Sequence, residues 1–147
     1  MLDKIQKLRE ITGAGVINCQ KALKESGGDI DKAIEIIHER GEVIAAKKSS
    51  RATGAGLLHS YIHGGRIGVL VEIRCETDFV AKSDDFKALI HNLAMQIAAM
   101  DPEDVDDLLK QNYIKDESLT VDALVKQTLA KVGENIVVRR FTRYALG

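Results

Sequence analysis

The stretch LLHSYIHGGRIGVLVEIRC, residues 57–75, constrains the fold more than any other part of the chain. Two runs rich in β-branched and apolar residues flank Gly64 and Gly65, and a glycine pair in that position is a strong signal for the turn of a β-hairpin. Alternate residues of a strand share one face. In the second run the residues of one face are all apolar: Ile67, Val69, Val71, Ile73 and Cys75. The sequence therefore predicts a hairpin with one face turned towards a core.

Two amphipathic helices and a third strand are predicted after the hairpin. The first helix starts near Ser83 and ends before the only proline, Pro102, whereas the second runs from a Thr120 cap to Gly133. The run NIVVRRFTRYAL, residues 135–146, then reads as a third strand. The order β-β-α-α-β predicts an α+β fold in which a small three-stranded antiparallel sheet is covered by helices on one face.

Three short helices are predicted before the hairpin. The segment TGAG, residues 12–15, separates the first two, and Gly27 with Gly28 separates the second from the third. Asp29 can cap the third helix, which is predicted to end near Gly41. A bundle of this size has a very small core, and such units usually serve as docking modules.

The composition changes after the third helix. Residues 45–56, AAKKSSRATGAG, are basic, small and glycine-bearing, which is typical of a helix end that runs into a linker. We therefore expect three parts: a three-helix module over residues 1–45, a helix end and linker over residues 46–55, and an α+β core over residues 56–147. So few elements leave sheet edge and apolar surface uncovered, which indicates that the core pairs with a second copy as a homodimer.

Composition bounds the class of protein. The 147 residues are 45% hydrophobic and 29% charged, as in soluble globular proteins, and the net charge of -1 provides no general attraction to nucleic acid or anionic membranes. No apolar run approaches the roughly 20 residues needed to span a bilayer. The N-terminus MLDKIQKLREI includes acids and reads neither as a signal peptide nor as a transit peptide. We expect a cytoplasmic protein, or one of an organelle matrix if an import sequence has been removed.

Candidate catalytic and metal sites are few. Neither TGAG segment continues as a phosphate-binding P-loop, and the histidines show no metal-ligand spacing with cysteine or carboxylate residues. Cys75 with His63 could be imagined as a nucleophile and its base, but Cys75 continues the apolar face of its strand, which favours a buried inert thiol. We therefore expect no enzyme, no cofactor and no bound metal.

Nucleic-acid binding is a further alternative. The segment RRFTRY, residues 139–144, interleaves basic and aromatic residues as single-strand binders do. It lies on a strand that has to cover the core, however, and aromatic residues make up only 4% of the chain. This pattern disfavours direct contact with nucleic acid.

The junction between the second strand and the following helix carries the most specific pattern. The segments LREITGAGVINCQKAL, GDIDKAIEIIHERG, GVLVEIRCETDFVAKSDDF and GENIVVRRFTRYALG occur in this order and cover most of the chain. With its Thr77–Asp78–Phe79–Val80–Ala81 signature, the chain resembles elongation factor Ts. The resemblance implies a ubiquitin-associated-like N-terminal module, an α+β core, and guanine nucleotide exchange on the translation GTPase elongation factor Tu.

The resemblance also implies roles for particular residues. Asp78 and Phe79 match the pair that intrudes beside the Mg²⁺ and phosphate end of the GTPase's nucleotide site, and Thr77 and Val80 would fix that turn. The alternative for Phe79 is a purely structural role, in which it packs under Phe86 at the start of the helix.

A second set of residues matches the family's other contacts with the GTPase. These partner-docking positions are Arg9, Val16 and Ile17 in the N-terminal module and His63 in the core. The family commonly has methionines where this chain has Val16 and Ile17, so flexible packing is replaced by stiff branched side chains.

The chain also departs from the family in length. Only DPEDVDDLLKQN separates Met100 from Tyr113, where family members usually carry a long helical hairpin, and the second core half of long forms is missing. Two readings without exchange activity therefore stay open. One is an adaptor that binds other protein tails through the N-terminal module; the other is a structural subunit of a ribosome or replicase with the same fold.

Overall fold

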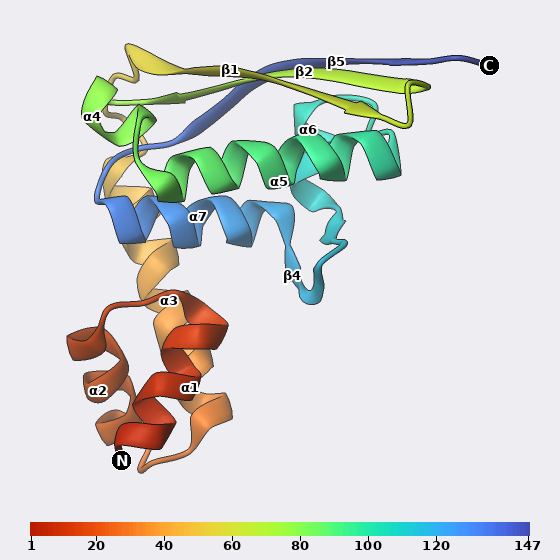
Figure 1. Ribbon diagram of the computed structural model, residues 1–147. Helices are drawn as coiled ribbons and strands as arrows, with labels where there is room; N and C mark the ends of the chain where they lie inside the picture. The colour runs from red at the N-terminus through yellow and green to blue at the C-terminus, as the bar shows by residue number, and fades with distance from the viewer.

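A three-stranded antiparallel sheet forms one layer of the structure, a computed structural model that describes residues 1–147 (Figure 1). Strand β2 (Ile67–Cys75) lies between β1 (Ala55–His63) and β5 (Val137–Ala145). Gly64 and Gly65, with φ of 58° and 66°, form the turn between β1 and β2, so the predicted hairpin is confirmed. The α+β class and the three-stranded antiparallel sheet predicted from the sequence are likewise confirmed.

The helices cover one face of this sheet in two layers. Helix α5 (Asp84–Met100) packs against β1 and β2, and α7 (Val121–Val132) lies on the far side of α5 from the sheet (Figure 1). Short helices α4 (Asp78–Ala81) and α6 (Val105–Lys110) complete the layer next to the strands. The core fills with the inward residues of β2 and the apolar stripes of both long helices, including Val71, Ile73, Phe86, Leu93, Ile97, Val121 and Leu129.

A short segment joins α5 to α7. It contains α6, β3 (Asn112–Tyr113) and β4 (Asp116–Thr120), of which the two strands form a small ribbon. The fully buried Gln96 of α5 holds this segment in place, since its amide donates to the Asn112 carbonyl oxygen at 3.0 Å and accepts from the Ile114 amide at 2.9 Å. Here α5 is followed by a compact connection and not by a helical hairpin.

The N-terminal helices form a second, smaller apolar cluster. Helices α1 (Leu2–Thr12), α2 (Val16–Glu25) and α3 (Ile30–Lys48) meet around a few buried residues, of which the largest are Leu8 and Leu23. Gly13, with φ of 70°, ends α1, and the Asp29 side chain caps α3 by accepting from the Lys32 amide, as predicted.

The predicted end of the third helix near Gly41 is wrong. Helix α3 continues to Lys48, because a single helical glycine costs only about 1 kcal/mol and the last turns of α3 gain contacts with the core. Ala45 is buried in the core cluster and Ile44 packs against it. As a result α3 is one long helix that reaches from the N-terminal bundle to the sheet layer (Figure 1). The exact three-part division of the chain stays a prediction.

No helix is both long and apolar enough to cross a membrane.

Candidate partner-binding site

The junction between β2 and α5 is a single helical turn, α4, that is anchored on one side and exposed on the other. Thr77 caps this turn by accepting a hydrogen bond from the Val80 amide at 3.3 Å. Val80 and Ala81 are buried in the core. Phe79 precedes these two buried residues in the same turn. Its side chain is 86% exposed, more than any other large apolar side chain of the molecule. The turn therefore presents a phenylalanine to solvent while its neighbours hold it to the core.

The structural alternative for Phe79 is wrong. Phe86 is fully buried beneath the sheet, whereas Phe79 projects away from it. The reason is that α4 and α5 are separate helices with separate caps. Ser83 begins α5 by accepting from the Phe86 amide, and its hydroxyl donates back to the Val80 carbonyl oxygen at 2.6 Å. This reversal points Val80 and Phe86 inward and leaves Phe79 outside.

Thr77 is held from a distant part of the chain. The Glu134 carboxylate accepts from the Thr77 amide at 3.0 Å through one oxygen and from the Thr77 hydroxyl at 2.8 Å through the other. The Cys75 thiol donates to the Thr77 carbonyl oxygen at 3.2 Å. Sequence reasoning missed Glu134, because it lies 57 residues beyond Thr77 and no local pattern connects the two.

The thiol of Cys75 is buried, as predicted. It is fully buried, and burial, followed by the negative charge of Glu134, raises its pKa. The imagined pairing with His63 is excluded by the register, since Cys75 lies opposite Ala55 and His63 opposite Ile67 at the other end of the hairpin. Eight residues of strand separate the two by roughly 26 Å.

The positions predicted for docking in the N-terminal helices lie in another part of the molecule. Arg9 stands in the last turns of α1, and Val16 and Ile17 are exposed at the start of α2, directly after the loop that joins the two helices. His63 is exposed at the end of β1, where its Nδ1 is 2.9 Å from the Tyr61 hydroxyl oxygen. The structure thus brings Thr77, Asp78, Phe79 and Val80 together and leaves the predicted docking positions in two separate places.

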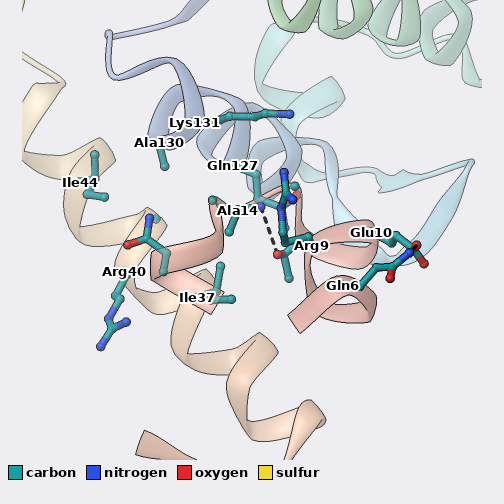
Figure 2. Close-up of a pocket in the computed structure, with 15 residues that line it drawn as sticks. Gln6, Arg9, Glu10, Ala14, Ile37, Arg40, Ile44, Gln127, Ala130 and Lys131 are labelled. Atoms are coloured by element: carbon teal, nitrogen blue, oxygen red, sulfur yellow. Dashed lines mark hydrogen bonds between the residues drawn. The ribbon is translucent and has the colours of Figure 1, made fainter. Parts of the chain in front are cut away.

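A cavity of about 630 Å³ lies where the N-terminal bundle meets the core (Figure 2). Arg9 of α1, Arg40 of α3 and Lys131 of α7 line it, together with Gln127. Two of the cations already have acidic partners: Arg40 pairs with Glu25, and Lys131 lies 2.9 Å from an Asp85 oxygen. Arg9, predicted from the sequence as a docking position, thus also lines this junction.

The face of the sheet opposite the helices is uncovered (Figure 1). Leu58 and Ile62 of β1, 62% and 65% exposed, stand on this outer face beside Leu70 of β2. Glu72 lies between two arginines there and accepts hydrogen bonds from Arg140 and Arg74, each at 2.8 Å. Both bonds lower the pKa of Glu72, and the bond from Arg140 has the larger effect. This outer face combines exposed apolar side chains with a satisfied charged cluster.

Comparison with known proteins identifies the family. The sequence matches the family model described as Elongation factor TS over residues 76–146, a span that starts one residue before Thr77 and includes all of β5. An elongation factor Ts of Thermotoga neapolitana is 44% identical over 190 residues, which cover 99% of this chain and 96% of that protein. The chain belongs to the elongation factor Ts family.

Other members of the elongation factor Ts family differ from this chain in length. The Gloeothece citriformis protein is 46% identical over 190 residues, or 97% of this chain and 66% of the relative. The Nostoc sp. protein is 52% identical over 143 residues, or 97% of this chain and 45% of the relative. The chain therefore spans about two thirds of one relative and less than half of the other.

The lengths of these alignments also locate the difference inside the chain. An alignment over 190 residues is longer than the 147 residues of this chain, so the Thermotoga and Gloeothece relatives contain internal residues that this chain lacks. The compact connection from α5 to α7 is where the sequence predicts that a family segment is missing.

Proposed function

We propose that this chain is a translation elongation factor that binds GDP-bound elongation factor Tu and promotes release of GDP. In this proposal the Asp78–Phe79 turn enters the GTPase beside its nucleotide and disturbs the Mg²⁺ and phosphate end of that site. The observation that carries the proposal is Phe79, 86% exposed on a turn whose other residues are capped or buried. The family membership gives the kind of partner.

A wedge suits this task because nucleotide exchange makes and breaks no covalent bond in the exchange factor. Burial of a phenylalanine on a partner gains roughly 1.5–3 kcal/mol. Each tenfold weakening of nucleotide binding needs about 1.4 kcal/mol of coupling free energy. Phe79 alone could therefore supply on the order of a hundredfold, and a larger effect needs the rest of the interface. The protein itself would not be an enzyme and would need no cofactor.

Asp78 supports the wedge by its charge. It is exposed next to Phe79, so on insertion its carboxylate would meet the loops around the partner's Mg²⁺. The ion neutralises the phosphate charge in such GTPases, so displacing it weakens the hold on GDP. Thr77 and Val80 keep the turn in shape during the insertion.

Docking away from the nucleotide site would supply the remaining affinity. Arg9 with the exposed Val16 and Ile17 offers one mixed charged and apolar contact in the N-terminal module, and His63 offers another at the end of β1. Because these positions are separated from Phe79 in the structure, the GTPase would be held at more than one place. Thermodynamic linkage then requires that nucleotide weakens this grip by the same factor, so the exchange factor leaves when GTP binds.

A homodimer is part of this proposal. The uncovered outer face of the sheet, with Leu58, Ile62 and Leu70, is the surface on which a second copy would pack. We place the protein in the cytoplasm with its GTPase.

The deciding experiment is stopped-flow release of a fluorescent GDP from elongation factor Tu, with the wild-type chain and with Phe79→Ala. We expect wild type to accelerate release and the variant to lose one to two decades of that acceleration. Equal acceleration by both proteins would remove Phe79 from the mechanism. Binding without any acceleration would favour the second candidate, a structural subunit of the same fold, which the shortened connection from α5 to α7 supports.

A further inference from the structure

We propose that Glu134 is a positioning residue for nucleotide exchange, whose carboxylate grips Thr77 and thereby fixes the direction in which Phe79 projects. The proposal rests on the proposed function, since it concerns the same turn. The proposal includes the claim that Glu134 immobilises the turn, and this claim can be tested without the GTPase.

The grip is bidentate. Each of the two Glu134 oxygens accepts one hydrogen bond, at 3.0 Å from the Thr77 amide and at 2.8 Å from the Thr77 hydroxyl. Paired hydrogen bonds to a carboxylate fix orientation as well as distance, and they are stronger than bonds between neutral groups. A single bond would let Thr77 rotate about the contact, whereas two bonds prevent that rotation.

The grip is passed on to the rest of the turn through Thr77. Its hydroxyl also accepts from the Val80 amide, and its carbonyl oxygen accepts from the Cys75 thiol and from the Ala81 amide at 3.2 Å. Thr77 therefore connects Glu134 to the first helical hydrogen bonds of α4. Phe79 lies within this hydrogen-bonded turn, two residues from the gripped threonine.

The turn cannot hold Phe79 by itself. Helix α4 has four residues, far below the length at which a helix is stable without outside contacts. Phe79 is exposed and gains no rigidity from packing. Support on the C-terminal side comes from the buried Val80 and from Ser83, and support on the N-terminal side comes from Glu134 through Thr77. A wedge held in its bound direction loses less conformational freedom on insertion, so more of its contact energy acts on the partner.

A second hydrogen bond fixes Glu134 in turn. Glu76, one residue before Thr77, accepts from the amide of Asn135, one residue after Glu134, at 2.6 Å. The two segments therefore grip each other reciprocally, with one glutamate from each side. Asn135 is buried and its side chain donates to the Arg51 carbonyl oxygen at 3.0 Å, which also ties this loop to the residues that follow α3. The base from which Glu134 acts is thus itself anchored.

The first test needs only this chain. Chymotrypsin cleaves after exposed phenylalanines, but only where the backbone can open locally. We expect Glu134→Ala to speed cleavage after Phe79 about tenfold, which corresponds to about 1.4 kcal/mol, because both charge-assisted hydrogen bonds to Thr77 are removed. Glu134→Gln keeps one acceptor for the Thr77 amide, so its rate of cleavage after Phe79 should lie between those of Glu134→Ala and wild type. Glu117→Ala, at an exposed glutamate of β4, is the matched control and should cleave like wild type.

A purely structural role of Glu134 gives a different result. Such a role predicts faster cleavage at all sites together, in step with a lower midpoint of urea unfolding, and this result would overturn the proposal. An increase confined to Phe79, with the unfolding midpoint nearly unchanged, supports positioning. Unchanged cleavage after Phe79 in both Glu134 variants overturns the proposal.

The second test uses the fluorescent-GDP release assay and its dependence on the concentration of this chain. Positioning of the wedge predicts that Glu134→Ala lowers the maximal release rate about tenfold and changes the half-saturating concentration less than about twofold. A change in half-saturating concentration alone would assign Glu134 to docking and overturn the proposal. If wild type itself fails to accelerate release, the proposed function fails, while the cleavage experiment still decides whether Glu134 holds the turn.

Discussion

Lys126 of α7 and Glu42 of α3 form an ion pair of 2.7 Å that joins the N-terminal bundle to the core. The same ammonium group lies 2.9 Å from Asp122 within α7. Its hydrogen bond to Glu42 raises the pKa of Lys126 most, and its hydrogen bond to Asp122 raises it further. Next to this pair, Gln127 of α7 and His38 of α3 form a hydrogen bond of 2.7 Å. The orientation of α3 on the core therefore depends on polar contacts as well as on Ile44 and Ala45.

We predict that the Lys126–Glu42 pair contributes about 0.5 kcal/mol to stability, because both side chains are partly exposed and solvent screens them. A double-mutant cycle with Lys126→Gln and Glu42→Gln, followed by urea unfolding, measures this coupling. High salt should reduce it, since a screened ion pair weakens as ionic strength rises. Asp122→Asn is the control, because it removes the pair within α7 and leaves the pair across the junction. A coupling above about 2 kcal/mol would mean that the junction is far less hydrated than its exposure indicates.

The two phenylalanines near the turn should respond oppositely to truncation. Phe86 is fully buried, so Phe86→Ala is expected to lower the free energy of unfolding by about 3–5 kcal/mol. Phe79→Ala is expected to change it by less than about 0.5 kcal/mol, because an exposed side chain gives up little burial. Chemical denaturation of both variants tests this pair of expectations. A large loss of stability in Phe79→Ala would show that this side chain packs on the protein in solution.

Gly56 on β1 lies against the backbone of β2. Its φ is 153°, and a Cβ added there would stand 2.3 Å from the Ile73 carbonyl oxygen and 2.8 Å from the Arg74 Cα. Backbone atoms cannot move aside as a flexible side chain can, so Gly56→Ala should cost more than about 2 kcal/mol. Gly54→Ala is the matched control, because a Cβ there meets no atom within 4 Å. Thermal unfolding of the two variants should differ by several degrees, and equal melting temperatures would contradict the close approach.

Two histidines connect the edge strand to the main helix. His59 Nε2 of β1 and His91 Nδ1 of α5 are 3.1 Å apart, and Tyr61 stacks edge-on against His91. Burial lowers the pKa of His59 from its ordinary value of 6.5, and the charge of the neighbouring His91 lowers it to a smaller extent. The unfolded chain then binds a proton at His59 more readily than the folded protein does. The free energy of unfolding should therefore be largest above about pH 6.5 and fall as the pH drops below that value.

Urea unfolding between pH 5 and pH 8 measures this dependence. His59→Gln removes the titrating group and should flatten the slope in the acidic part of the range. His91→Gln removes the neighbour and should flatten the slope in part, since the pKa of His59 then moves towards its ordinary value. A slope that persists undiminished in both variants would assign the acid sensitivity to other groups.

The sheet and the long helices of the core could be predicted from the sequence because their signals are local. The glycine pair at Gly64 and Gly65, the alternation along β2 and the caps at Ser83 and Thr120 each lie within one element. The continuation of α3 past Gly41 escaped prediction, because contacts of Ile44 and Ala45 with a core more than 20 residues away outweigh the local signal of Gly41. Tertiary packing decided that boundary and not propensity.

The candidate site shows the same division. The pattern around Asp78 and Phe79 located the turn, and the cap at Thr77 is readable from its sequence. The support by Glu134 depends on two segments that meet only in the folded chain, as does the approach of His59 to His91. Periodicity within an element cannot reveal such pairs, because it contains no information on contacts between segments.

We predict that the chain forms a dimer in solution through the outer face of the sheet. Ile62 and Leu58 are exposed there beside Leu70, and Ile62 lies over Gly68 of the neighbouring strand, where a Cβ would come within 3.2 Å of its terminal methyl carbon. Ile62→Arg should place a charge in the contact without disturbing the covered face, because the Ile62 side chain is exposed. Sedimentation equilibrium should then give a dimer for wild type and a monomer for Ile62→Arg. Lys115→Ala, at an exposed residue outside the sheet, should remain a dimer. A wild-type chain that sediments as a monomer at tens of micromolar would leave the outer face free and contradict the homodimer.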